Sequence, residues 1–200
     1  SMFQLGKILL LSTVSVLGTA SVAANAIGNT LASFQVVPGT ALGLAIVTVV
    51  SRCAGASEYD RARYYTKKMM RTAYLYTVLV IALILACLPL ILKLYNVSDQ
   101  AREWATQILW MHGLCGILIW PLAFTLPQAL RAAGDTRFTM VASTVSMWTL
   151  RVGLGVLLGR YWGFGVLGIW MAMFADWALR AALFVPRFHG HKWETMGLEN

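Results

Sequence analysis

The chain has 200 residues, of which 58% are hydrophobic and 12% are charged. A soluble domain carries about a quarter charged residues, and the apolar blocks here exceed the roughly 18 residues that mark a membrane span. The net charge of +8 comes from basic residues at the ends of these blocks, which is the membrane pattern and not a nucleic-acid-binding one. The sequence therefore predicts an all-α membrane protein with no nucleic-acid partner.

Six membrane spans are predicted in chain order, forming a single lobe over residues 1–200. They cover residues 3–18, 20–54, 72–94, 104–130, 139–158 and 166–188. A polar, basic loop, 55–71, separates the second span from the third, and a polar tail, 189–200, follows the sixth. Trp193 in this tail is expected to anchor at the membrane interface.

The predicted orientation comes from the basic residues. Ten Lys and Arg lie on the side of loop 55–71 and the tail, whereas the other side carries Lys93, Arg102 and Arg160. By the positive-inside rule we expect both termini in the cytoplasm. The expected location is the bacterial inner (plasma) membrane.

One side of the second span carries small and amide residues. At 100° per residue, that side comprises Asn25, Gly28, Asn29, Ala32, Gly39 and Gly43. Two interpretations stay open: close helix packing through Gly39 and Gly43, or the polar wall of a transport cavity. Pro38 removes a backbone hydrogen bond and is expected to bend this span.

The fourth span combines two prolines with polar groups. Pro121 and Pro127 predict bends of the kind found both in transporters and in static bundles. His112 is a candidate proton carrier because its pKa lies near neutrality, although a lone membrane histidine is more often simply hydrogen-bonded.

The spans also contain charged residues, which are costly there. Asp176 lies four residues from Arg180, so the two share a helix face. Counting back from the link near residue 162 puts Arg151 within about 4.5 Å of the same depth. An isolated charge costs about 2.5–3.5 kcal/mol at mid-membrane, so we expect Asp176 to pair with Arg151, while Arg180 extends to the cytoplasmic end. The pair either joins helices or belongs to a proton or ion path.

The sequence shows no catalytic constellation. It contains no G-x-S-x-G or H-E-x-x-H motif, and its three cysteines are not paired in a C-x-x-C motif. We therefore expect no enzyme activity, no catalytic residues and no metal site.

The segment "PQALRAAGDTRFTM", residues 127–140, carries a family resemblance. It resembles the P-x-x-L-R-G-A-G-D-T-R-x-x-M signature of the multidrug and toxic compound extrusion (MATE) family. "SVAANAIGNTL" and "GVLGIWMAMFADWALRAALF" are similar to its second and last helices. The resemblance implies the second six-helix lobe of a twelve-helix, two-lobe antiporter in the lipid bilayer, lacking its N-terminal lobe. Such antiporters export cationic or amphipathic compounds by alternating access, in exchange for H⁺ or Na⁺ and without a bound cofactor.

The resemblance also implies roles for individual residues. The cavity would be lined by Asn25, Asn29, Gln35, His112 and Gln128. The signature turn would be formed by Arg131, Gly134, Asp135 and Thr136. Within that turn, Asp135 is placed to cap the fifth helix and Gly134 to form the turn. The first and fourth spans lack the coupling carboxylates of one family branch, so the coupling acid is expected in the absent lobe.

Two alternative functions remain. One is half of a lipid-linked oligosaccharide flippase, whose cavity should be rich in Arg and Lys; only Arg151 and Lys7 are available within the spans. The other is a membrane scaffold that transports nothing.

Overall fold

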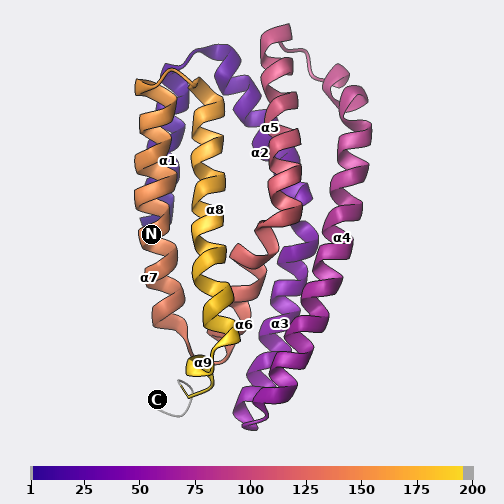
Figure 1. Cartoon of the computed structure of the whole chain (residues 1–200). Coiled ribbons are helices and arrows are strands. Elements are labelled where there is room, and N and C mark those ends of the chain that lie inside the picture. The colour runs from indigo at the N-terminus through magenta and orange to yellow at the C-terminus, as the bar shows by residue number, and fades with distance from the viewer. Residues whose placement is uncertain (1, 196–200) are drawn as a thin grey trace.

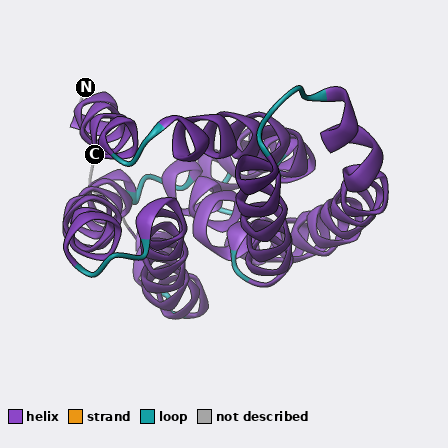
Figure 2. Ribbon diagram, turned by 90° about the horizontal axis from the view of Figure 1, so that it is seen from above, coloured by secondary structure: helices purple, strands orange, loops and turns teal. Residues whose placement is uncertain are grey.

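The structure, a computed structural model, describes residues 2–195 as a bundle of helices (Figure 1). The α-helices are α1 (Met2–Val16), α2 (Thr19–Gln35), α3 (Val37–Gly55), α4 (Tyr59–Leu94), α5 (Asp99–Leu118), α6 (Leu126–Ala132), α7 (Thr136–Ser146), α8 (Gly165–His189) and α9 (Lys192–Thr195). Three π-helical segments are η1 (Pro121–Thr125), η2 (Met147–Leu154) and η3 (Leu157–Tyr161). Short loops connect these helices, and no strand occurs in the described part (Figure 2).

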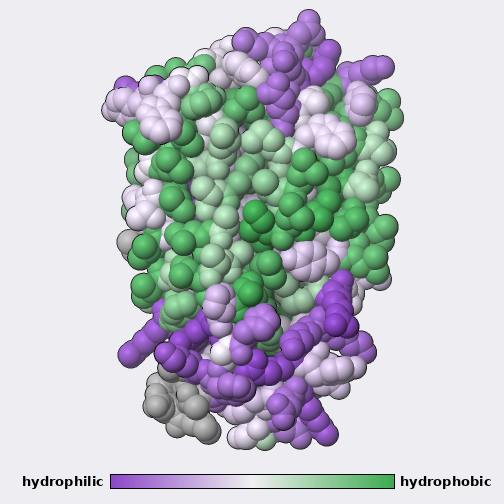
Figure 3. Space-filling model, in the orientation of Figure 1, coloured by the Kyte–Doolittle hydropathy of each residue, from purple (hydrophilic) through white to green (hydrophobic). Residues whose placement is uncertain are grey.

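The outer surface of the bundle matches a lipid environment. An apolar belt lies between two hydrophilic ends (Figure 3). Among residues 2–195, four helical segments are long and apolar enough to cross a membrane: α3, α4, the run Thr136–Tyr161 and α8. A fifth forms if α5 and the bent segment Pro121–Ala132 count as one span, whereas α1 is a shorter apolar helix. The predicted fold class, an all-α membrane protein, is confirmed.

The second span, predicted as one long helix bent at Pro38, is two helices. It consists of α2 and α3, with Val36 between them, and Pro38 lies in the first turn of α3. Proline is tolerated there because its missing N–H would lack an intrahelical acceptor anyway. The break gives the small residues of the two helices different neighbours: Gly28 on α2 lies against Ile108 and Trp170.

The prediction of a loop over 55–71 is also wrong. Only Ala56, Ser57 and Glu58 lie between α3 and α4, and α4 continues for 36 residues to Leu94. The Arg, Lys, Met and Ala residues of this stretch favour a helix in water as well as in lipid. Polarity therefore marked the membrane boundary here and not the helix end.

Close helix contacts surround the prolines of the fourth span. The chain bends by 59° between α5 and the segment Pro121–Ala132, where Pro121 begins η1 and Pro127 lies in the first turn of α6. Gly39 allows α3 to approach this bend, because a Cβ there would lie 2.3 Å from Trp120 Cζ3. Gly43 one turn later faces Gln128, so both glycines serve helix packing.

The bundle has two ends that differ in composition. We name "basic end" the end that carries the 56–58 turn, the 133–135 link and α9, at the bottom of Figure 1. One hydrophobic cluster, around Ile108 and Trp170, joins α2, α5 and α8. A second, around Leu130 and Phe184, joins α3, α6, α8 and α9 nearer the basic end.

Candidate functional site

Two of the cavities in the described part of the bundle bear on the predicted site, and the first contains predicted cavity residues. This α1–α8 cavity has a volume of about 290 Å³. It is lined by Lys7, Leu10, Leu11, Val14, Asn25, Asn29, Arg151, Ile169, Trp170 and Met173. An apolar wall with a few convergent polar groups is the usual composition of a small-molecule site.

Hydrogen bonds orient the polar groups of the α1–α8 cavity. Asn25 Oδ1 accepts a bond from Trp170 Nε1 at 3.1 Å. Asn29 Nδ2 donates to the Asn25 carbonyl one turn earlier at 2.8 Å. Arg151 donates through Nη2 to Met173 Sδ at 3.0 Å, a weak acceptor that leaves most guanidinium donors for a ligand. The cavity thus presents cations and amides beside an indole ring.

A buried charge cluster lies behind this cavity and corrects the predicted pairing. Asp176 is fully buried, and its Oδ1 accepts a bond from Arg180 Nε at 2.8 Å. Its Oδ2 lies 4.0 Å from Arg151 Nη1. The predicted ion pair of Arg151 and Asp176 is therefore present, but the expected ranking of Arg151 ahead of Arg180 is wrong. The depth estimate assumed an α-helical rise, whereas η2 is π-helical; Arg180 lies one turn from the acid on α8.

Arg180 does not extend to the cytoplasmic end, contrary to the prediction. Its side chain is 4% exposed, and Nη2 donates to the Ser143 carbonyl at 3.0 Å. The guanidinium also lies 5.2 Å from the Phe124 ring centroid. Ser146 adds a hydroxyl bond to the Asp176 carboxylate. The cluster therefore connects α7, α8 and η1 through bonds that lipid could not replace.

Gln35 and His112 do not line either cavity, so that prediction is wrong. Both are buried, with His112 Nδ1 2.5 Å from Gln35 Oε1. The imidazole is enclosed by the rings of Trp170, Phe174 and Trp177, with centroids 5.2–6.4 Å away. This geometry matches a hydrogen-bonded core histidine that links α2 to α5.

The predicted signature turn borders a second cavity, between α3 and α7. This α3–α7 cavity has a volume of about 590 Å³. It is lined by Gly39, Thr40, Gly43, Trp120, Phe124, Gln128, Arg131, Thr136, Arg137, Thr139, Met140, Ser143 and Arg180. Gln128 was expected beside Asn25 and Asn29, but it lies in this separate cavity, because Val36 breaks the second span and the fourth span bends by 59°.

Asp135 does not cap α7 with its side chain, contrary to the prediction. It occupies the position before the helix, but no cap bond forms, and Oδ2 instead accepts from Arg187 Nε at 2.6 Å. A charge-assisted bond to a guanidinium is stronger than one to a backbone amide. Gly134 beside it has a φ of 99°, in the left-handed region that favours glycine.

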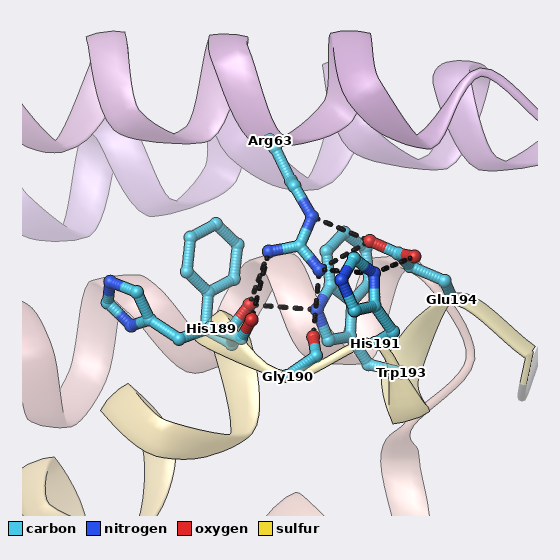
Figure 4. Close-up of polar contacts among 7 residues, drawn as sticks. Arg63, His189, Gly190, His191, Trp193 and Glu194 are labelled. Carbon is cyan, nitrogen blue, oxygen red and sulfur yellow. Dashed lines mark hydrogen bonds and ion pairs between the residues drawn. The ribbon is translucent and has the colours of Figure 1, made fainter.

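A cluster at the basic end was not predicted from the sequence (Figure 4). Arg63 on α4 donates through Nε to Glu194 Oε1 at 2.6 Å, and through Nη2 to the Gly190 carbonyl at 2.8 Å. Trp193 is fully buried and stacks on Phe188 at 5.6 Å, so the expected interfacial position of Trp193 is wrong. We name these five residues the Arg63 clamp. A glycine and a tryptophan after a helix end were the only signals for it.

The Glu194 carboxyl is the titratable group of the clamp. Partial burial acts to raise its pKa, but hydrogen bonds from His191 and Arg63 and the positive charge of Arg63 lower it, and the net pKa lies below 4.5. The carboxylate therefore stays charged in the closed clamp. Among residues 2–195, no three His, Cys, Asp or Glu side chains come close enough to hold a metal ion.

Comparisons with known proteins give a consistent result. The family model described as MatE matches residues 1–157. The chain is 24% identical over 192 residues to the "Probable multidrug resistance protein NorM" of Thermotoga maritima, covering 96% of the chain and 41% of that protein. It is 25% identical over 191 residues to the "Probable multidrug resistance protein YoeA" of Bacillus subtilis, again covering 96% and 41%. The chain thus spans about two fifths of the length of these relatives.

Proposed function

The chain belongs to the MatE family, and we propose that it forms one six-helix lobe of an ion-coupled multidrug efflux antiporter. Proteins of this family are membrane transporters and not enzymes. The proposed cargo is a cationic or amphipathic compound, exported by alternating access. The N-terminal six-helix lobe is the proposed partner, since the relatives are more than twice as long as this chain.

The α1–α8 cavity is the observation that carries this proposal. Its apolar lining, the Trp170 ring and the two amides offer the mixed surface that suits amphipathic compounds of varied shape. Lys7 and Arg151 line it, and no acidic side chain does. Because like charges repel in a medium of low dielectric constant, the lining favours neutral or anionic amphiphiles over cations.

We assign ion coupling, to H⁺ or Na⁺, to the N-terminal lobe. Asp176 is buried between Arg180 and Arg151. Both guanidinium groups lie beside its carboxylate and repel an incoming cation. A role for Asp176 in joining helices therefore fits the geometry better than a role in binding the coupling ion.

The proposed orientation places the basic end and both termini in the cytoplasm. The excess of Lys and Arg at that end supports this orientation. Bacterial relatives support the inner (plasma) membrane as the location.

Efflux of an anionic amphipathic dye, 8-anilino-1-naphthalenesulfonate, from drug-sensitive bacterial cells tests the proposed function. Cells expressing this lobe joined to its proposed N-terminal partner should lose the dye faster than cells with an empty vector. An Asn29→Trp change, which fills the α1–α8 cavity, should reduce that rate at equal protein abundance. Retention equal to the empty vector would contradict efflux and would favour the non-transporting scaffold.

One observation favours a second candidate, half of a lipid-linked oligosaccharide flippase. Lys7 and Arg151, the two cations that such a cavity would need, line the same space. Calorimetric titration with inorganic pyrophosphate separates the two functions. A flippase half should bind pyrophosphate in the α1–α8 cavity and lose that part of the heat of binding in Arg151→Gln, whereas in an efflux lobe Arg151→Gln should leave the heat of binding unchanged.

A further inference from the structure

The α3–α7 cavity has an unusual charge composition for a family of cation exporters. Arg131, Arg137 and Arg180 line it, together with hydroxyl groups of Thr40, Thr136, Thr139 and Ser143 and the amide of Gln128. All of these groups can donate hydrogen bonds, and the lining contains no carboxylate.

The nearest acids are already engaged elsewhere. Asp135, between the two surface arginines in sequence, is buried and pairs with Arg187 at 2.6 Å. Asp176 pairs with Arg180 at 2.8 Å and with Arg151 at 4.0 Å, and it makes no ion pair with Arg131 or Arg137. Within residues 2–195, neither Arg131 nor Arg137 forms an ion pair, and Arg131 Nε makes a long contact of 3.4 Å to the Pro127 carbonyl. The positive charges of Arg131 and Arg137 therefore remain available at the cavity.

The inner part of the same cavity is aromatic. Trp120 and Phe124 stack at a centroid distance of 5.2 Å with an angle of 22° between their planes. Arg131, Thr136 and Arg137 are exposed, so the cavity reaches the surface at the basic end. A ligand with an anionic group at these arginines can place an apolar part against the two rings.

We propose that the α3–α7 cavity binds a phosphate-bearing amphiphile, with its phosphate held by Arg131 and Arg137. Guanidinium groups bind phosphate oxygens through paired, charge-assisted hydrogen bonds. The exposed hydroxyl of Thr136 can add another donor. The site is separate from the α1–α8 cavity and does not depend on efflux. The phosphate can come from an anionic phospholipid of the adjoining leaflet or from a soluble phosphate.

Native mass spectrometry of the purified chain in detergent tests this site. The probes are phosphatidylglycerol, phosphatidylcholine and inorganic phosphate, each titrated separately. We expect retention of phosphatidylglycerol at one stoichiometric site and at least tenfold weaker retention of phosphatidylcholine. Arg131→Gln/Arg137→Gln should reduce phosphatidylglycerol retention at least tenfold.

A matched variant controls for general surface charge. Lys67→Gln/Lys68→Gln removes two exposed cations near the same end, from α4, without touching the cavity. It should bind phosphatidylglycerol as the unmodified chain does, and equal losses in the two double variants would overturn the site. Thr40→Trp should block the lipid while keeping every charge. Unchanged phosphatidylglycerol binding in a folded Thr40→Trp variant would also overturn the proposed site.

Inorganic phosphate identifies the source of the ligand. Weak competition by phosphate supports a lipid, because the apolar contacts are then missing. If inorganic phosphate displaces phosphatidylglycerol at equal concentration, and this displacement requires Arg131 and Arg137, the result also supports the anion site. It then assigns the site to soluble phosphates. Competition that persists in Arg131→Gln/Arg137→Gln would contradict the assignment.

Discussion

Two arginine clusters hold this bundle together, and they differ in their access to water. The Asp176 cluster lies between membrane helices, with the acid 0% exposed and Arg180 4% exposed. In the Arg63 clamp at the basic end, Arg63 and Glu194 are 17% and 18% exposed. Water can replace lost bonds in the clamp, but lipid cannot replace them in the Asp176 cluster. We therefore expect the first cluster to determine whether the bundle folds, and the second to determine whether the chain after α8 stays attached.

Breaking the Asp176 cluster should have the largest effect. Asp176→Asn leaves the buried Arg180 and the half-buried Arg151 without a countercharge, and breaking a buried ion pair costs about 3–5 kcal/mol. Thermal unfolding of the purified protein in detergent should show a large fall in the midpoint, with poor yield. An unchanged midpoint would mean that the cluster contributes little to folding.

Double variants then test which arginine is the main partner. Because Arg180 lies at 2.8 Å from Asp176 and Arg151 at 4.0 Å, Asp176→Asn should couple more strongly to Arg180→Gln than to Arg151→Gln. A coupling of about 1–3 kcal/mol is typical of residues in one network. A larger coupling to Arg151, from the same unfolding measurements, would restore the ranking expected from the sequence.

Breaking the clamp should cost less and act locally. Arg63→Ala removes bonds to Glu194 and to the backbone carbonyls of residues 188, 189 and 190, at about 1–2 kcal/mol because the group is partly exposed. Hydrogen–deuterium exchange should rise in residues 188–195, with the membrane helices unchanged. Arg61→Ala is the control: its pair with Glu58 is 69% and 44% exposed, so exchange should stay as in the unmodified chain. Equal changes in the two variants would contradict a specific clamp.

Protonation of Glu194 should have the smallest effect. Its pKa in the folded protein is held below the ordinary 4.5. The stability from this group is therefore present above pH 4.5 and is lost as the pH falls through the folded pKa. Exchange in residues 188–195, corrected for its intrinsic pH dependence, should rise only below about pH 4.5. Glu194→Gln should remove that rise, and a rise that persists would assign it to another group.

The sequence predicted the elements that depend on hydropathy and local chemistry. Apolar blocks located the membrane helices, and the cost of a buried charge indicated that Asp176 needs a partner. The prediction from sequence failed where a polar segment was interpreted as a loop. The segment after Tyr59 is polar, but it is helical. Hydropathy marks the membrane boundary, whereas the helix propensity of the Arg, Lys, Met and Ala residues favours a helix that continues beyond it.

Tertiary contacts account for the other failures. Gln35 is bonded to a histidine 77 residues away, and Arg63 to a glutamate 131 residues away. No periodicity within one helix predicts such pairs. The positions of Asn25 and Asn29 beside Arg151 likewise depend on how α2, η2 and α8 pack.

Binding of two matched ions tests the central claim, that the α1–α8 cavity holds the transported amphiphile. Tetraphenylborate and tetraphenylphosphonium have nearly the same shape and opposite charge, and calorimetry on the purified chain in detergent measures both affinities. Tetraphenylborate should bind more tightly than tetraphenylphosphonium. The affinity for tetraphenylborate should fall at least tenfold in Asn29→Trp. It should not fall in Ser33→Trp, a change one turn further along α2 and outside the cavity. Equal affinity of the Asn29→Trp and Ser33→Trp variants would contradict the central claim.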